Sequence, residues 1–294
     1  DSAATVLAEP VAVPGTKVSL EPPQGFTLSK QFTGFMREDV TASIVVTEMP
    51  APVTEIKDAM TRENLAKKDM VLLESTPIQH GGKEALLVKA SQRVNGMDFL
   101  KWMLITGEDN ATTMIVGTCP KQVAEELSAP IQQAVLSASI NTALAKDVFE
   151  GLLFRIEPSD KLKIAGRMGN VLLLTETGET RAAAVEAPLF VIGNSVSQST
   201  IDDLPAFAQA RAAKTAQVKD MRNFEGRPMT LDGMAAYELL ADATDGKSDL
   251  PMRLYQVIAP NGDHYFIAQG LVGASRGEEM LPEFKRVTES FKRQ

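Results

Sequence analysis

The chain has 294 residues and a formal net charge of −8, and its hydrophobic and charged fractions are 44% and 23%, which are ordinary values for globular proteins. No apolar run approaches the ~18 residues of a membrane-spanning helix, so we expect no membrane span. Residues 1–146 hold 13 basic and 17 acidic side chains, and residues 147–294 hold 17 and 21. Both halves are acidic, whereas binding to nucleic acid requires clustered Lys and Arg, so we expect no nucleic-acid partner.

Residues 1–17 are rich in Ala, Val and Pro and lack an amphipathic period. We interpret them as an N-terminal tether, of the kind that follows the cleavage site of an exported protein or a lipid-bearing cysteine. The expected location is therefore periplasmic or extracellular. The chain has one cysteine, which allows no internal disulfide and leaves the redox compartment undetermined.

In the first half, predicted strands surround one helical segment. The stretches Lys17–Leu20 and Thr41–Glu48 are expected to be strands, the second because it is rich in Val, Ile and Thr. Met49-Pro50-Ala51-Pro52 ends the second of them, and a helix is predicted from Thr54 to about Lys68. Further strands follow and are separated by turns such as Gly81-Gly82, a pattern typical of an antiparallel meander.

The first half closes with an apolar strand, Gly117 and an amphipathic helix, and the same order returns in the second half. An offset of 153 residues carries Gly117 onto Gly270, Ile131 onto Phe284 and Ser137 onto Ser290. In both copies the apolar residues of the helix recur at helical spacing, which gives one face suited to cover a sheet. The first copy has Leu127, Ile131, Ala134 and Ala138 on this face, and the second has Met280, Phe284, Val287 and Phe291.

This repetition predicts a tandem duplication. We expect a tether at 1–17, a first repeat at 18–146 and a second repeat at 147–294. The predicted fold class is α+β, with each repeat an antiparallel β-sheet flanked by α-helices. In the second repeat we expect Ser199 or Thr200 to cap one helix and Ser275 to cap the last.

The order of elements, together with two pairs of glycine motifs, resembles the PsbP-like superfamily, which includes the extrinsic P subunit of photosystem II, a Ran-GTPase-binding protein and the DcrB-like bacterial envelope proteins. The motifs are Gly81-Gly82-Lys83-Glu84-Ala85 with Val116-Gly117-Thr118, and Gly233-Met234-Ala235 with Gln269-Gly270-Leu271. The resemblance covers residues 18–140 and 152–291, although the family usually has a single domain. It implies an antiparallel sheet covered by helices, in proteins that bind or stabilise partners without catalysis and that in bacteria are often exported.

Two residues suggest nucleophilic chemistry. Ser275 lies in Gly273-Ala274-Ser275-Arg276-Gly277, which satisfies the G-x-S-x-G pattern, but both histidines precede it, whereas the histidine of an α/β-hydrolase follows the serine. Cys119 precedes Pro120, an expected first helical residue, and a helix N-terminus would lower its pKa. Neither residue has a counterpart in the other repeat, so we expect both to have local structural roles.

The sequence predicts no metal site and no cofactor, because it has no cluster of ligands at metal-binding spacing. His80 stands in a Gly-Gly turn and is expected to be solvated, whereas His264 should pack at a hairpin turn. The aspartates Asp242, Asp245 and Asp249 suggest a loop for a hard cation, but the closing glutamate is missing and a solvated hairpin tip is favoured.

Trp102, the only tryptophan, lies in a strand that is apolar on both faces. One face should contact a helix, and the other must be covered by a second layer, by the other repeat or by a partner. One face carries Leu100, Trp102 and Leu104, and the other carries Phe99, Met103 and Ile105. We take Trp102, Leu100 and Leu104 as the candidate binding residues, with burial in the core as the alternative.

The sequence therefore favours an exported, non-catalytic binding or scaffolding protein that acts on a protein partner. A second hypothesis is a carrier of an apolar small molecule or lipid, because 13 Met and 12 Phe would line an adaptable cavity. A serine hydrolase that uses Ser275 is the third. We expect no enzymatic activity.

Overall fold

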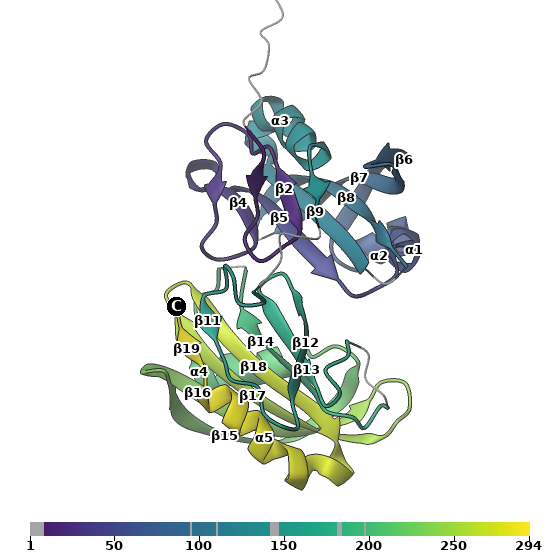
Figure 1. Cartoon of the computed structure of the whole chain (residues 1–294). Helices are drawn as coiled ribbons and strands as arrows, with labels where there is room; N and C mark the ends of the chain where they lie inside the picture. Colours follow the sequence, from purple (N-terminus) through teal and green to yellow (C-terminus); the bar gives the residue numbers. More distant parts are fainter. Residues whose placement is uncertain (1–8, 95, 110, 142–146, 181–183, 197) are drawn as a thin grey trace, which may run out of the picture. The chain divides into compact units, whose positions relative to one another are not determined.

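The computed structural model describes residues 9–94, 96–109, 111–141, 147–180, 184–196 and 198–294. The chain divides into two compact units, Asp1–Gly151 and Leu152–Gln294, and each unit contains a seven-stranded antiparallel sheet (Figure 1). The predicted α+β class with two repeated sheet domains is confirmed.

In the first unit the sheet has the strand order β3-β4-β5-β9-β8-β7-β6. The strands from β6 to β9 form the predicted meander, since each pairs with the next along the chain. The strand bounds are β3 Thr27–Leu28, β4 Gly34–Arg37, β5 Ala42–Met49, β6 Met70–His80, β7 Lys83–Val94, β8 Met97–Glu108 and β9 Ala111–Pro120.

Helices cover both faces of this sheet (Figure 1). The helix α3 (Ala124–Leu136) packs on the face that carries Trp102, Leu104 and Ile115. The short helices α1 (Val53–Asp58) and α2 (Arg62–Ala66) pack on the opposite face. The single helix predicted from Thr54 to Lys68 is wrong, because Thr61 accepts a hydrogen bond from the Asn64 N–H and starts a separate helix there.

The expected tether includes ordered structure. Residues 1–8 lie outside the described part of the chain, but β1 (Val11–Ala12) pairs with β2 (Val18–Leu20), which also pairs with β10 (Ser139–Ile140). Between β1 and β2, Val13 is buried in the core beneath α3. Residues 9–17 therefore belong to the first unit, because they bury apolar surface against it.

In the second unit the sheet has the strand order β12-β13-β14-β18-β17-β16-β15, and a separate pair joins β11 to β19. The strand bounds are β11 Phe154–Arg155, β12 Lys163–Met168, β13 Val171–Thr175, β14 Leu189–Asn194, β15 Val218–Leu231, β16 Met234–Asp245, β17 Pro251–Asn261, β18 His264–Gly273 and β19 Lys292–Arg293.

Both predicted helix caps in the second unit are wrong. The helix α4 (Leu204–Ala212) is capped by Asp203, whose carboxylate accepts from the Ala206 N–H, and Pro205 fits the first turn because no N–H is needed there. The helix α5 (Gly277–Glu289) follows a 3-10 turn, η3 (Ala274–Arg276), which contains Ser275. Similar 3-10 turns, η1 (Glu38–Val40) and η2 (Lys121–Val123), lie in the first unit.

The two units share contacts as well as strand order. A Cβ atom on Gly117 would lie 2.2 Å from the Ile131 side chain, and one on Gly270 would lie 2.5 Å from the Phe284 side chain. In both units this glycine therefore lets the last long helix approach the sheet closely.

The serine that follows each of these helices makes the same backbone contact in both units. The Ser137 hydroxyl accepts a hydrogen bond from the backbone N–H of Glu21, and the Ser290 hydroxyl accepts one from that of Glu157. These paired contacts agree with the duplication that the offset of 153 predicts.

Candidate functional site

Ser275 is exposed, and its hydroxyl donates to the Glu186 carboxylate at 3.0 Å rather than to a histidine. His264 begins β18 and Ser275 follows the end of that strand, so roughly 30 Å of extended chain separates them. His264 is therefore too far along the strand to act as a general base for Ser275.

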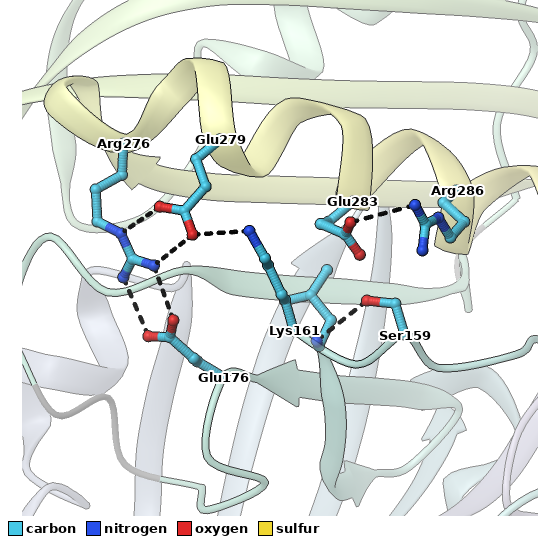
Figure 2. Close-up of polar contacts among 8 residues, drawn as sticks. Ser159, Lys161, Glu176, Arg276, Glu279, Glu283 and Arg286 are labelled. Carbon is cyan, nitrogen blue, oxygen red and sulfur yellow. Dashed lines mark hydrogen bonds and ion pairs between the residues drawn. The ribbon is translucent and has the colours of Figure 1, made fainter.

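Next to Ser275, an ion-pair network fixes the start of α5 (Figure 2). The Arg276 guanidinium donates two hydrogen bonds to the Glu176 carboxylate, at 2.8 and 3.0 Å, and a further one to Glu279 at 3.2 Å. Lys161 adds a contact of 3.0 Å to Glu279. The bidentate geometry ties α5 to the segment after β13 and to the loop before β12, so this cluster is structural.

This network predicts acid-sensitive stability. Hydrogen bonds from Arg276 hold the pKa of Glu176 and of Glu279 below the usual range. A carboxyl group with a lowered pKa in the folded state stabilises the protein above its unfolded pKa, and this contribution is lost as the pH falls through the folded pKa. Arg276→Gln is therefore expected to reduce the free energy of unfolding at pH ~7, with a difference from wild type that shrinks below pH ~4.

Urea unfolding over this pH range measures that difference. Lys67→Gln is the matched control, because Lys67, which follows the last residue of α2, forms an exposed pair with Glu63 whose removal should change little. A constant deficit of Arg276→Gln at every pH would contradict a role for the two carboxylates.

Cys119 is buried within β9, in the core beneath α3. Burial raises the pKa of its thiol, which disfavours the reactive thiolate. Cys119 does not lie at the N-terminus of an α-helix as expected, because Pro120 ends the strand, the 3-10 turn η2 follows, and α3 begins only at Ala124. The structure therefore assigns Cys119 to the core.

Both histidines have structural partners. His80, expected to be solvated, is half-buried, and its Nε2 lies 3.2 Å from the Leu136 carbonyl at the end of α3. His264 packs at the hairpin turn as expected. Its Nδ1 lies 3.5 Å from the Ser195 hydroxyl, and its Nε2 lies 3.4 Å from the Asp263 carboxylate.

This Ser195, His264 and Asp263 arrangement contains the residue types of a catalytic triad, which the sequence analysis missed. Its contacts join the segment after β14 to the start of β18. The Ser195 hydroxyl accepts from the Tyr265 N–H at 3.1 Å, and the Ser195 carbonyl lies 3.2 Å from Nδ1, in competition with the hydroxyl. The long distances and this competition leave no activated nucleophile, so the cluster serves to hold the loop that leads to α4 against β18.

In the loop that was considered for a hard cation, Asp245 bonds to the residues that follow it in the same turn. The Asp245 carboxylate accepts hydrogen bonds from the Lys247 N–H, the Ser248 N–H and the Ser248 hydroxyl. These bonds lower the pKa of Asp245. Across the described ranges, no group of three or more His, Cys, Asp or Glu side chains could hold a metal ion.

The candidate binding residues Trp102, Leu100 and Leu104 all lie on the face of β8 that α3 covers. Trp102 is 6% exposed, its indole N–H donates to the Ser128 hydroxyl of α3 at 3.1 Å, and Lys89 lies over its ring. Leu104 is fully buried, and Leu100 packs at the margin of the same cluster. The structure therefore places these three side chains in the core of the first unit rather than on a surface.

Exposed apolar side chains instead occur on β6, which is an edge strand of the first sheet. Val71 is 60% exposed and Leu73 is 45% exposed. Glu74 is the only charged residue from Met70 to Thr76. An apolar edge with free backbone groups is a surface on which another strand can pair.

The corresponding edge of the second unit is protected. There β15 has two irregularities in register, between Lys219 and Arg222 and between Arg222 and Glu225. Asp220 and Asn223 have positive φ angles of 51° and 52°. Bulges and charged residues of this kind disrupt edge pairing. The edge strand β15 thus has two irregularities where β6 has one, and β6 exposes Val71 and Leu73.

No protein-family model and no curated protein matches this chain. Solved structures do. A solution structure of cyanobacterial PsbP from Synechocystis is 10% identical, with 48% of this chain and 96% of that chain covered and a TM-score of 0.32. LpqN of Mycobacterium tuberculosis, described as involved in cell envelope biogenesis, is 14% identical over 47% of this chain and 82% of that chain, with a TM-score of 0.34.

A third match covers both units. The immunity protein TplEi of T6SS from Pseudomonas aeruginosa is 10% identical over 99% of both chains, with a TM-score of 0.34. A PsbP protein is thus among the solved structures that this chain matches. No helix in the described part of the chain combines the length and apolarity needed to cross a membrane.

Proposed function

We propose that this chain is a non-catalytic binding protein that takes up an extended segment of a protein partner along β6. The observation that carries this proposal is the apolar edge, where Val71 and Leu73 are 60% and 45% exposed on a strand that, in the described part of the chain, pairs with β7 alone. A partner strand would form main-chain hydrogen bonds to β6, and apolar side chains would contact Val71 and Leu73. Within β6, the irregularity in register between Leu72 and Glu74 and the missing N–H of Pro77 limit the stretch along which a partner strand can pair continuously.

Mutation of the edge tests this function. In extract of the native host, full-length wild-type protein is expected to retain a protein that Val71→Lys retains about tenfold less, because a lysine on an edge strand opposes pairing. Retained proteins are identified and quantified by mass spectrometry. Val71 is exposed, so we expect the substitution to change the free energy of unfolding by no more than about 0.5 kcal/mol.

Phe224→Lys is the matched control, because Phe224 is 36% exposed on β15, the corresponding edge of the second unit. This variant should retain the same proteins as wild type. Equal retention by wild type and Val71→Lys, or retention of no protein, would contradict the proposal.

We further propose that the protein acts outside the cytoplasm. The support is the resemblance to a superfamily whose bacterial members are often exported. Fractionation of host cells followed by immunoblotting tests this location, and detection of the protein in the cytoplasmic fraction alone would contradict it.

A further inference from the structure

Three polar side chains form a row across the first sheet, on the face opposite α3. Lys101 of β8 is the cross-strand partner of Thr118 on β9, and Thr118 is the partner of Ser43 on β5. Directly opposed residues in a sheet point to the same face. The three side chains are half-buried.

The positive charge of the Lys101 ammonium group is not balanced by a nearby negative charge in the described part of the chain. Its Nζ lies 3.4 Å from the Thr118 hydroxyl, and among the described residues it has no carboxylate partner. Burial lowers the pKa of Lys101. A charged group partly removed from water without an opposite charge costs free energy, so its presence in a sheet face requires an explanation.

The second unit provides an internal comparison. At the three corresponding positions it has Leu254, Leu271 and Leu189, which are paired across β17, β18 and β14 in the same way. Leu254 and Leu271 pack in a cluster with Ala212 of α4. The fold therefore accommodates an apolar row here, and the polar row of the first unit is not a requirement of the fold.

Apolar residues border the polar row on both sides of the same face. Phe99 lies two residues before Lys101, and Met103 lies two residues after it, while Val116 and Val45 are opposed to each other and to Met103. Phe99, Val116 and Val45 are half-buried, as are the polar residues. A cation and two hydroxyls are thus set within an apolar surface.

We propose that the row of Lys101, Thr118 and Ser43 binds the carboxylate of an amphipathic anion of the fatty-acid class. The carboxylate would accept a charge-assisted hydrogen bond from Lys101 and further hydrogen bonds from the two hydroxyls. The alkyl chain would leave the row on the side of Val116 and Val45 and remove their apolar surface from water. This site is independent of the β6 edge, and it gives the hypothesis of an apolar carrier a defined position.

Calorimetric titration of the full chain with octanoate, octanol and acetate tests the proposal. Wild type should bind octanoate more tightly than either of the other compounds. Lys101→Met should weaken octanoate binding by about tenfold or more, because a hydrogen bond to a charged group is lost, and should leave octanol binding unchanged. Lys121→Met is the matched control, since Lys121 is exposed in the same unit, and it should bind octanoate as wild type does.

Circular dichroism establishes that each variant is folded, and Ser43→Ala provides a second, conservative variant that should weaken octanoate binding to a smaller extent. Octanoate binding should also fall as the pH rises through the lowered pKa of Lys101, and Lys101→Met should abolish this dependence. The proposal would be overturned if acetate or octanol bound as tightly as octanoate, if octanoate did not bind, or if folded Lys101→Met bound it like wild type.

Discussion

Replacement of Gly270 by Val is expected to destabilise the second unit by about 3 kcal/mol. A Cβ atom at this position would lie 2.5 Å from Cδ2 and 2.7 Å from Cγ of Phe284. The Phe284 ring has little freedom to move, because it is fully buried and stacks at centroid distances of 5.5 Å on Phe190 and 6.1 Å on Tyr255. The helix α5 would therefore have to shift away from the sheet.

Urea unfolding followed by circular dichroism measures this effect. Gly277→Ala is the matched control, because Gly277 has a helical φ of −55° and its added Cβ would lie 3.5 Å from the nearest Arg253 atom. This variant should be neutral or up to about 1 kcal/mol more stable than wild type. A Gly270→Val protein as stable as wild type would show that α5 does not approach the sheet through this glycine.

Truncation of Trp102 to Ala is expected to destabilise the first unit by about 3–5 kcal/mol. The side chain is only 6% exposed, it packs in the core beneath α3, and its indole N–H donates to Ser128. Truncation removes this burial and this hydrogen bond and leaves a cavity. An interaction surface would behave differently, because substitution of an exposed residue changes stability little.

Calorimetric melting and urea unfolding, monitored by circular dichroism, compare Trp102→Ala with Trp102→Phe and Val71→Ala. Trp102→Phe keeps most of the apolar contact and should cost less, and Val71→Ala should cost little because Val71 is 60% exposed. If Trp102→Ala unfolded like wild type, the assignment of this residue to the core would be wrong.

The repeated architecture could be predicted from the sequence because it depends on patterns along the chain. Gly117 and Gly270 stand at the same offset as Ile131 and Phe284, and the structure brings each glycine against its apolar residue. Helix boundaries were predicted less well. Ser275 and Thr54 resemble caps in sequence, but a 3-10 turn before α5 and a second start at Thr61 determine where the helices begin.

The candidate sites could not be predicted, because they depend on pairing between distant segments. Lys101, Thr118 and Ser43 become neighbours only through the register of three strands. Ser195 and His264 lie 69 residues apart and meet across β14 and β18. The exposure of Val71 depends on β6 being the last strand of its sheet, whereas Trp102 attracts attention in the sequence because it is the only tryptophan and is buried by α3.

Amide hydrogen exchange of the full chain, with and without the protein captured through β6, tests the proposed function most directly. Binding of an extended segment should slow exchange at amides of Met70–Thr76, because main-chain hydrogen bonds form along this edge, and should leave the amides of β15 unchanged. Unchanged exchange along β6 in the bound state, with protection elsewhere, would contradict the assignment of this edge as the binding surface.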